Sequence, residues 1–116
     1  MGKELQQVTL NLLSEGSEFT GDFVAVNDTR VDGVIKGGIK TAGRVVIGST
    51  AKVKGDIEAV GVDVMGTVEG NIVSSGIVTL RESAVFTGTM RAAYVVIENG
   101  AIFNGECCIE RESFQK

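Results

Sequence analysis

Six glycines recur along most of the chain at nearly even spacing, and each has an apolar residue two positions before it and two positions after it. The spacings between successive members are 16, 18, 15, 18 and 17 residues. A repeat of this length cannot bury its own apolar face, so its copies must stack on one another. The members of this glycine ladder are Gly21, Gly37, Gly55, Gly70, Gly88 and Gly105.

The residues around the ladder alternate between apolar and polar. In "VKGDI" at 53–57 and "VEGNI" at 68–72, the alternation places Val53 and Ile57 on an inner face and Lys54 on an outer face. The two stretches would then be equivalent strands on neighbouring coils. The ladder glycines have two explanations that stay open: a corner with positive φ, or a tight approach to the core axis.

A second apolar cluster follows each ladder glycine at about half a period, which fits roughly three short strands per repeat. Apolar residues make up 43% of the chain and aromatic residues only 5%, so the core must be aliphatic. Its valines and isoleucines favour strands. The sequence therefore predicts an all-β, single-domain parallel β-helix of about six coils at residues 19–110, with a flexible N-terminal segment at 1–18 and a short tail at 111–116.

No residue pattern indicates catalysis or cofactor binding. The chain has no histidine, which the left-handed hexapeptide-repeat enzymes use as a base or metal ligand. The only Gly-Lys pair, Gly2-Lys3, precedes Glu4 rather than Ser or Thr, so there is no P-loop. The net charge of −4 with scattered basic residues argues against nucleic acid. We expect no catalytic, cofactor, metal or nucleotide site.

The adjacent Cys107 and Cys108 fit neither a disulfide framework nor a usual zinc spacing. By alternation Cys107 matches the core position of Ile57 and Ile72, whereas Cys108 points outward. We expect one buried and one surface thiol in a reducing cytosol, with a cross-link through Cys108 as the alternative.

The C-terminal end lacks a strong cap, because "ERESFQK" at 110–116 is polar or charged apart from Phe114. An uncapped β-helix end is a row of unpaired strand edges over an apolar core, and such ends tend to join. We expect a polymer interface with Phe103, the bulkiest inward residue of the last coil, at its centre. The predicted interface comprises Ile97, Ile102, Phe103, Cys107 and Ile109.

Outside the ladder, apolar residues cluster only near the N-terminus. They are the candidate membrane contact, and the alternative is a strand or loop that covers the first coil. No stretch is long enough for a signal-peptide core or a membrane span, so we expect a cytoplasmic protein that attaches to the membrane peripherally. The cluster consists of Val8, Leu10, Leu12 and Leu13.

Three stretches resemble the bactofilins, bacterial polymer-forming cytoskeletal proteins: "LLSEGSEFTG" at 12–21, "VDGVIKGGIKTAGRVVIGSTAKVKGDI" at 31–57 and "VVIENGAIFNGECCI" at 95–109. The resemblance implies a right-handed β-helix with flexible termini. It also implies non-polar filaments that assemble from the protein itself without nucleotide, often at the inner membrane. Such filaments scaffold cell shape or localise other proteins, including cell-wall proteins. This chain departs from the commoner pattern in its very short C-terminal tail.

The alternative function is a short β-helix interaction module, a monomer or small oligomer that displays a flat face to a protein partner. It is a different class of function from a filament subunit. The two differ in one observable, because only a filament subunit forms long polymers when it is purified alone.

Overall fold

The computed structural model describes residues 10–109, and these residues form fifteen β-strands and no helix. Most strands are three or four residues long, as expected for short strands joined by corners. The strands are β1 (Leu10–Leu13), β2 (Glu18–Thr20), β3 (Phe23–Ala25), β4 (Asp28–Val31), β5 (Val34–Lys36), β6 (Ile39–Thr41), β7 (Arg44–Ile47), β8 (Lys52–Lys54), β9 (Ile57–Ala59), β10 (Gly61–Val64), β11 (Thr67–Ser74), β12 (Ile77–Leu80), β13 (Val85–Ala92), β14 (Tyr94–Ile97) and β15 (Ile102–Ile109).

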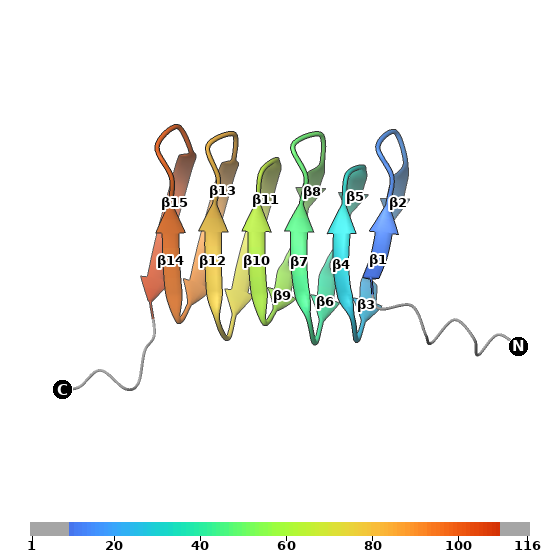
Figure 1. The fold of residues 1–116 in the computed structure, drawn as a ribbon, viewed down its shortest axis with the longest axis horizontal. Helices are drawn as coiled ribbons and strands as arrows, with labels where there is room; N and C mark the ends of the chain where they lie inside the picture. Colours follow the sequence, from blue (N-terminus) through green and yellow to red (C-terminus); the bar gives the residue numbers. More distant parts are fainter. Residues whose placement is uncertain (1–9, 110–116) are drawn as a thin grey trace, which may run out of the picture.

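The strands wind into a three-sided solenoid (Figure 1). One side is a six-stranded sheet in the order β1-β4-β7-β10-β12-β14. A nine-stranded sheet supplies the other two sides, because β11 pairs with β8 along its first half and with β9 along its second. Every strand pairing is parallel, for example Val53 with Val68 and Ile57 with Ile72. The predicted all-β parallel β-helix is confirmed.

The six coils differ from the prediction in detail. Five successive pairings join them from β1 to β14, which makes about five turns of the helix. The first three coils have three short strands each. In the later coils, the second and third strands merge into the eight-residue strands β11, β13 and β15. They merge because pairing continues without a break through the ladder glycines, as at Gly70 with Gly88.

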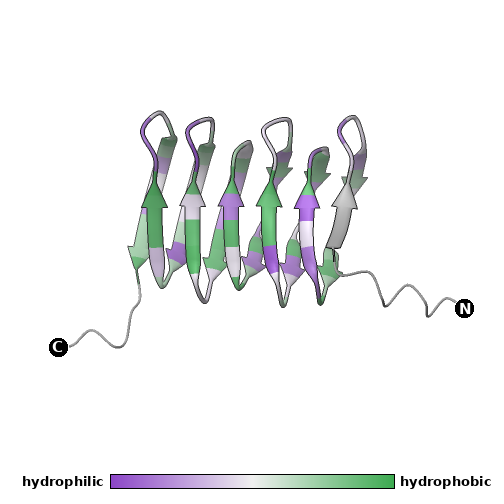
Figure 2. Ribbon diagram, viewed as in Figure 1, coloured by the Kyte–Doolittle hydropathy of each residue, from purple (hydrophilic) through white to green (hydrophobic). Residues whose placement is uncertain are grey.

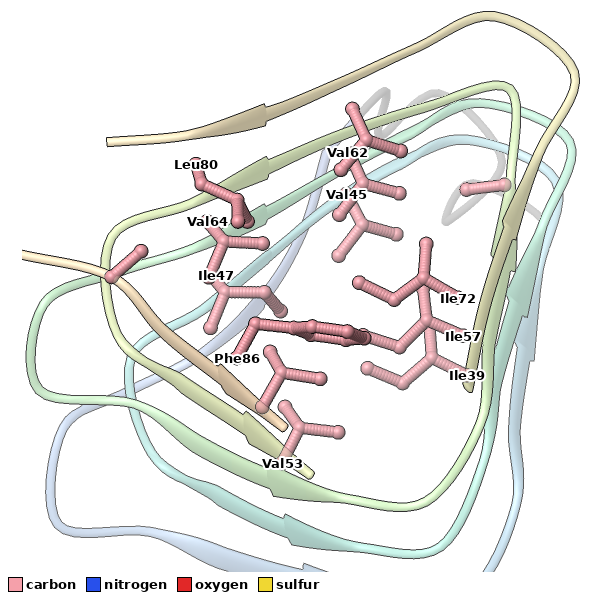
Figure 3. Close-up of a cluster of buried hydrophobic side chains, with 14 of the residues drawn as sticks. Ile39, Val45, Ile47, Val53, Ile57, Val62, Val64, Ile72, Leu80 and Phe86 are labelled. Carbon is pink, nitrogen blue, oxygen red and sulfur yellow. The ribbon is translucent and has the colours of Figure 1, made fainter. Parts of the chain in front are cut away.

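The core consists of columns of inward side chains that stack from coil to coil. Figure 3 shows Val45 beneath Val62, and Ile39, Ile57 and Ile72 in a second column. These residues are 0 to 2% exposed. As predicted, Val53 and Ile57 are buried and Lys54 is exposed. The columns are the hydrophobic cluster that stabilises the fold, since burial of aliphatic surface is the main favourable contribution.

The six ladder glycines occupy one corner of the triangle, and both explanations for them contain part of the answer. All six have positive φ, between 123° at Gly21 and 151° at Gly55. The close approach is to the neighbouring coil rather than to the core axis: a Cβ built on Gly55 would collide with the carbonyl of Gly37, and one on Gly70 with that of Gly55. Only glycine allows both the conformation and the contact.

The strand pairing extends N-terminal to the expected start of the β-helix at residue 19. β1 pairs with β4 in the register Leu10 with Asp28 and Leu13 with Val31. Residues 1–9 and 110–116, which include Val8 of the predicted membrane contact, lie outside the described residues. None of the described residues forms a helix that could cross a membrane.

Candidate polymerisation surface at the C-terminal end

The last coil has a strand neighbour on one side only. β14 pairs with β12, and β15 pairs with β13; no strand within residues 10–109 lies beyond them (Figure 1). The inward residues of this coil are therefore partly uncovered. Ile97 is 48% exposed, whereas its register partner Leu80 is 0% exposed. Figure 2 shows that β14 is hydrophobic along most of its length.

Phe103 is the largest side chain of this open layer. It is in register with Phe86, and the two rings stack with 5.4 Å between their centroids and 12° between their planes. Phe86 is fully buried, and Phe103 is partly buried against the same core. One face of Phe103 thus packs on the core, and the other is directed toward the open end.

The structure brings four of the five predicted interface residues into one layer. Ile97, Phe103, Cys107 and Ile109 are in register with the buried residues Leu80, Phe86, Met90 and Ala92. Ile102 is different, because it is in register with Val85 on the outer side of the strand, and it is 50% exposed. It borders the end layer and does not belong to it.

The cysteine pair differs from the expectation. Cys107 does continue the column of Ile72 and Met90, but it is exposed, as is Cys108. The core position is open because no further coil within residues 10–109 covers it. Partial burial raises the pKa of the Cys107 thiol, with a further contribution from Cys108, so its reactive thiolate is disfavoured.

An apolar hollow adjoins the end layer, and the sequence prediction missed it. Its volume is about 280 Å³. Tyr94 and Val96 on its outer side are 51% and 44% exposed. The only signal in the sequence was the apolar cluster at 95–97. The hollow is lined by Ile77, Ala93, Tyr94, Val95, Val96 and Ile109.

A network of charged side chains links the last three coils on their outer face. Arg81 of the corner after β12 donates to both carboxylate oxygens of Asp63, at 2.9 and 2.8 Å, and to Glu98 at 2.9 Å. These hydrogen bonds, first to Asp63 and then to Glu98, raise the pKa of Arg81. The Asp63–Arg81–Glu98 network therefore links three successive coils, the last of which contains β14.

The N-terminal end also carries an aromatic cluster. Phe19 and Phe23 flank Gly21 and pack edge to face, with 5.8 Å between centroids and 85° between planes. Both are partly buried against the core. Leu10, Leu12 and Leu13 of the predicted membrane contact belong to β1 of this same coil, and their backbone pairs with β4.

Within residues 10–109, no group of three or more His, Cys, Asp or Glu side chains is arranged to hold a metal ion. The carboxylates near the ladder have structural roles instead. Asp22 accepts from the N–H of Gly38 at 3.1 Å, and Asp56 from that of Asn71 at 3.2 Å. Each such bond ties one coil to the next.

Comparison with known proteins places this geometry in a family. The Bactofilin family profile, described as polymer-forming cytoskeletal, matches residues 11–108. Bactofilin BacO of Myxococcus xanthus is 33% identical over 88 residues, which cover 76% of this chain and 67% of BacO.

Among the solved structures that share the fold are two bactofilins. The first is the cryo-EM reconstruction of Thermus thermophilus bactofilin double helical filaments, with a TM-score of 0.80, 28% identity, and coverage of 86% of this chain and 99% of that one. The second is the solid-state NMR structure of the cytoskeletal bactofilin BacA, with a TM-score of 0.79, 30% identity, and coverage of 94% and 100%. With its parallel β-helix and its family match along almost the whole described length, the chain belongs to the bactofilins, a family of polymer-forming cytoskeletal proteins.

Proposed function

We propose that this protein, a structural protein rather than an enzyme, assembles end to end with itself into filaments without nucleotide. The observation that carries the proposal is the open apolar layer of the last coil, in which Phe103 stacks on Phe86 and Ile97 is 48% exposed. A soluble domain rarely leaves core positions uncovered unless another surface covers them. A second copy of the chain supplies such a surface.

The chemistry of the two ends favours joins between like ends. At a C-to-C contact each subunit presents the same layer, so one twofold axis satisfies both. The aromatic cluster of Phe19 and Phe23 gives the N-terminal end a matching contact. Alternating C-to-C and N-to-N contacts produce a filament without polarity.

Burial of apolar surface and pairing of strand edges drive the contact. Ile97, Ile109 and Phe103 lose exposed area when a second end covers them, and burial contributes about 25 cal/mol per Å². The edges of β14 and β15 gain partners for their backbone groups. Neither contribution involves a phosphate, and the sequence has no P-loop, which supports assembly without nucleotide.

In the cell, such a filament would scaffold cell shape or localise other proteins, including cell-wall proteins. Support comes from the cytoskeletal description of the family. We propose that any attachment to the inner membrane runs through Val8, Leu10, Leu12 and Leu13, the apolar cluster that precedes the ladder.

Electron microscopy and sedimentation of the purified full chain test the proposal. Filaments of equal length and equal pelleted fraction are expected in EDTA and in Mg-ATP or Mg-GTP. A pellet that requires nucleotide would contradict nucleotide independence. Single short particles under all conditions would instead support the β-helix interaction module, whose proteins act as monomers or small oligomers.

A further inference from the structure

The open edge of β14 is the strongest unexplained feature outside the Phe103 layer. β14 pairs with β12 on one side, and no described strand lies on the other. Val96 and Ile97 are 44% and 48% exposed, and the lining of the adjoining hollow is mostly apolar. An exposed apolar edge strand is a template for a further strand.

The described part of the chain ends beside this edge. Ile109, the last described residue, lines the hollow and is in register with Ala92, which lies one residue before the corner that leads into β14. Seven residues follow it, 110–116. As an extended strand they span about 23 Å, enough to run along β14.

A repeated hydrogen bond marks where such a strand would fall. The buried residues Val31, Ile47, Val64 and Leu80 form one column, and the carbonyl of each accepts an N–H from the next coil, from Gly48, Met65, Arg81 and Glu98 respectively. The donors are spaced by 17, 16 and 17 residues. The column ends at Ile97, and a further step of 17 residues from Glu98 leads to Gln115.

The corner that precedes each strand of the six-stranded sheet sets which side chains of that strand point inward. After Thr41 and Ser74 the next inward residues are Val45 and Val78, four positions on, and a hydroxyl accepting from Gly43 or Gly76 holds each corner. The corner after Ala25 is of this wide kind too, and its Asn27 carbonyl accepts from the Thr41 hydroxyl.

The narrow corners, after Ala59 and Ala92, take three positions and have no such hydroxyl. Ile109 also lacks a hydroxyl. Three positions after Ile109 is Glu112, and the alternation then makes Phe114 the next inward residue.

We propose that residues 110–116 bind along the open edge of β14 as a seventh strand of the six-stranded sheet, with Phe114 over Ile97 and Glu112 over Val95. The proposal places the one large apolar side chain of the tail on the half-exposed end of the core column. It concerns the single subunit and holds whether or not the protein polymerises.

The seventh strand would divide the C-terminal end into a closed side and an open side. An inward-pointing charge is a device that blocks further stacking on a strand edge, and Glu112 supplies one. Within the described residues β15 has no such cover, so in the end-to-end assembly proposed above the contact would be formed by Phe103, Cys107 and Ile109 and would no longer include Ile97. The tail therefore selects which edge of the last coil another subunit can join.

Disulfide trapping in the full chain tests this placement. In a Cys107→Ser, Cys108→Ser background, Ile97→Cys is combined with Phe114→Cys, and the dilute protein is oxidised with diamide. Register neighbours on adjacent strands lie about 4.8 Å apart, within the Cα range of a disulfide. The expected main product is an intramolecular disulfide, seen as a monomer of altered mobility on a non-reducing gel. Sedimentation of the same sample reports polymerisation separately.

A matched pair, Ile97→Cys with Gln115→Cys, controls for register, and its cross-link should be lost or minor. If this pair gave the main product, the corner would be of the wide kind and the placement of Phe114 wrong. A disulfide-linked dimer would mean that a second copy, not the tail, covers β14. Free thiols in both variants, with circular dichroism unchanged, would show that the tail does not bind there. As an independent readout, Phe114→Ser should speed hydrogen exchange of the Ile97 amide relative to the unmodified chain.

Discussion

Phe103 of the last coil lies over Phe86 of the coil before it, with 5.4 Å between ring centroids and nearly parallel ring planes. Phe86 has a coil on either side and is fully buried, whereas Phe103 has the core on one side only. The same residue type in the same column is thus core in one coil and surface in the next. Charge introduced at the two positions should have different effects.

Phe103→Arg should disperse the polymer and leave the domain folded. An arginine at this position can point away from the core into water in the single subunit, but an end contact would desolvate it without a partner. Sedimentation measures the loss of polymer, and circular dichroism measures the retained β signal. Thr87→Arg adds the same charge on the outer face of β13 and should pellet like the unmodified chain. Intact Phe103→Arg filaments would exclude Phe103 from the interface, and lost β signal would make it purely a core residue.

Gly70→Ala should lower the free energy of unfolding by at least about 2 kcal/mol. The residue has φ of +143°, and its Cβ would collide with the Gly55 backbone, which cannot move without shifting a coil. Urea unfolding followed by circular dichroism gives the measurement. In the control Gly38→Ala the new Cβ would meet its nearest atoms at an ordinary 3.4 Å, so the change should stay within about 1 kcal/mol. Equal effects at the two positions would refute the collision argument.

Arg81→Gln should lower the melting temperature slightly at low salt, and the difference should shrink at high salt. Arg81 bridges Asp63 and Glu98, but its side chain is 44% exposed, so the ion pairs are open to screening. At 1 M salt the screening length is only about 3 Å. Thermal unfolding at both ionic strengths measures the change. A large decrease in melting temperature that does not depend on salt would show that Arg81 stabilises the fold through packing instead of charge.

Cys107 should be alkylated by iodoacetamide in the single subunit and protected in the polymer. It is exposed in the open end layer and would be covered by an end contact. Because partial burial raises the pKa of Cys107, its thiolate fraction at pH 7 is below that of an ordinary cysteine. The rate of labelling should therefore rise with pH over a range that lies above the pKa of an ordinary cysteine. Mass spectrometry of Phe103→Arg subunits and of unmodified filaments gives the comparison, with Cys108 read in the same peptides. Equal labelling of Cys107 in both samples would contradict a contact at this end.

Deletion of residues 2–9 should weaken liposome binding and preserve the fold, because it removes Val8 and leaves β1 complete. Liposome co-sedimentation measures the binding. Val8→Glu is the matched point variant and should act in the same direction, since a charge opposes insertion of an apolar side chain. Binding unchanged in both variants, or absent from the full chain, would remove the proposed membrane contact.

The sequence alone determined the repeat, the inward positions and the absence of an obvious cofactor motif. These features are local: alternation at 53–57 and 68–72 assigns a strand face whatever surrounds it, and the spacing of the ladder glycines sets the length of a coil. Even the pairing of Val53 with Val68 follows from the period, because equivalent residues of stacked repeats must meet.

Only the tertiary structure decided what covers each position. Cys107 and Met90 share a column and look equally inward in the sequence, but Met90 has a coil on both sides and Cys107 has one. The same holds for Ile97 and Leu80. Likewise, the backbone that excludes a side chain at Gly70 belongs to Gly55, a whole turn away. Burial in a solenoid depends on the next coil along the axis, so alternation predicts that a side chain points inward but not how far a neighbouring coil covers it.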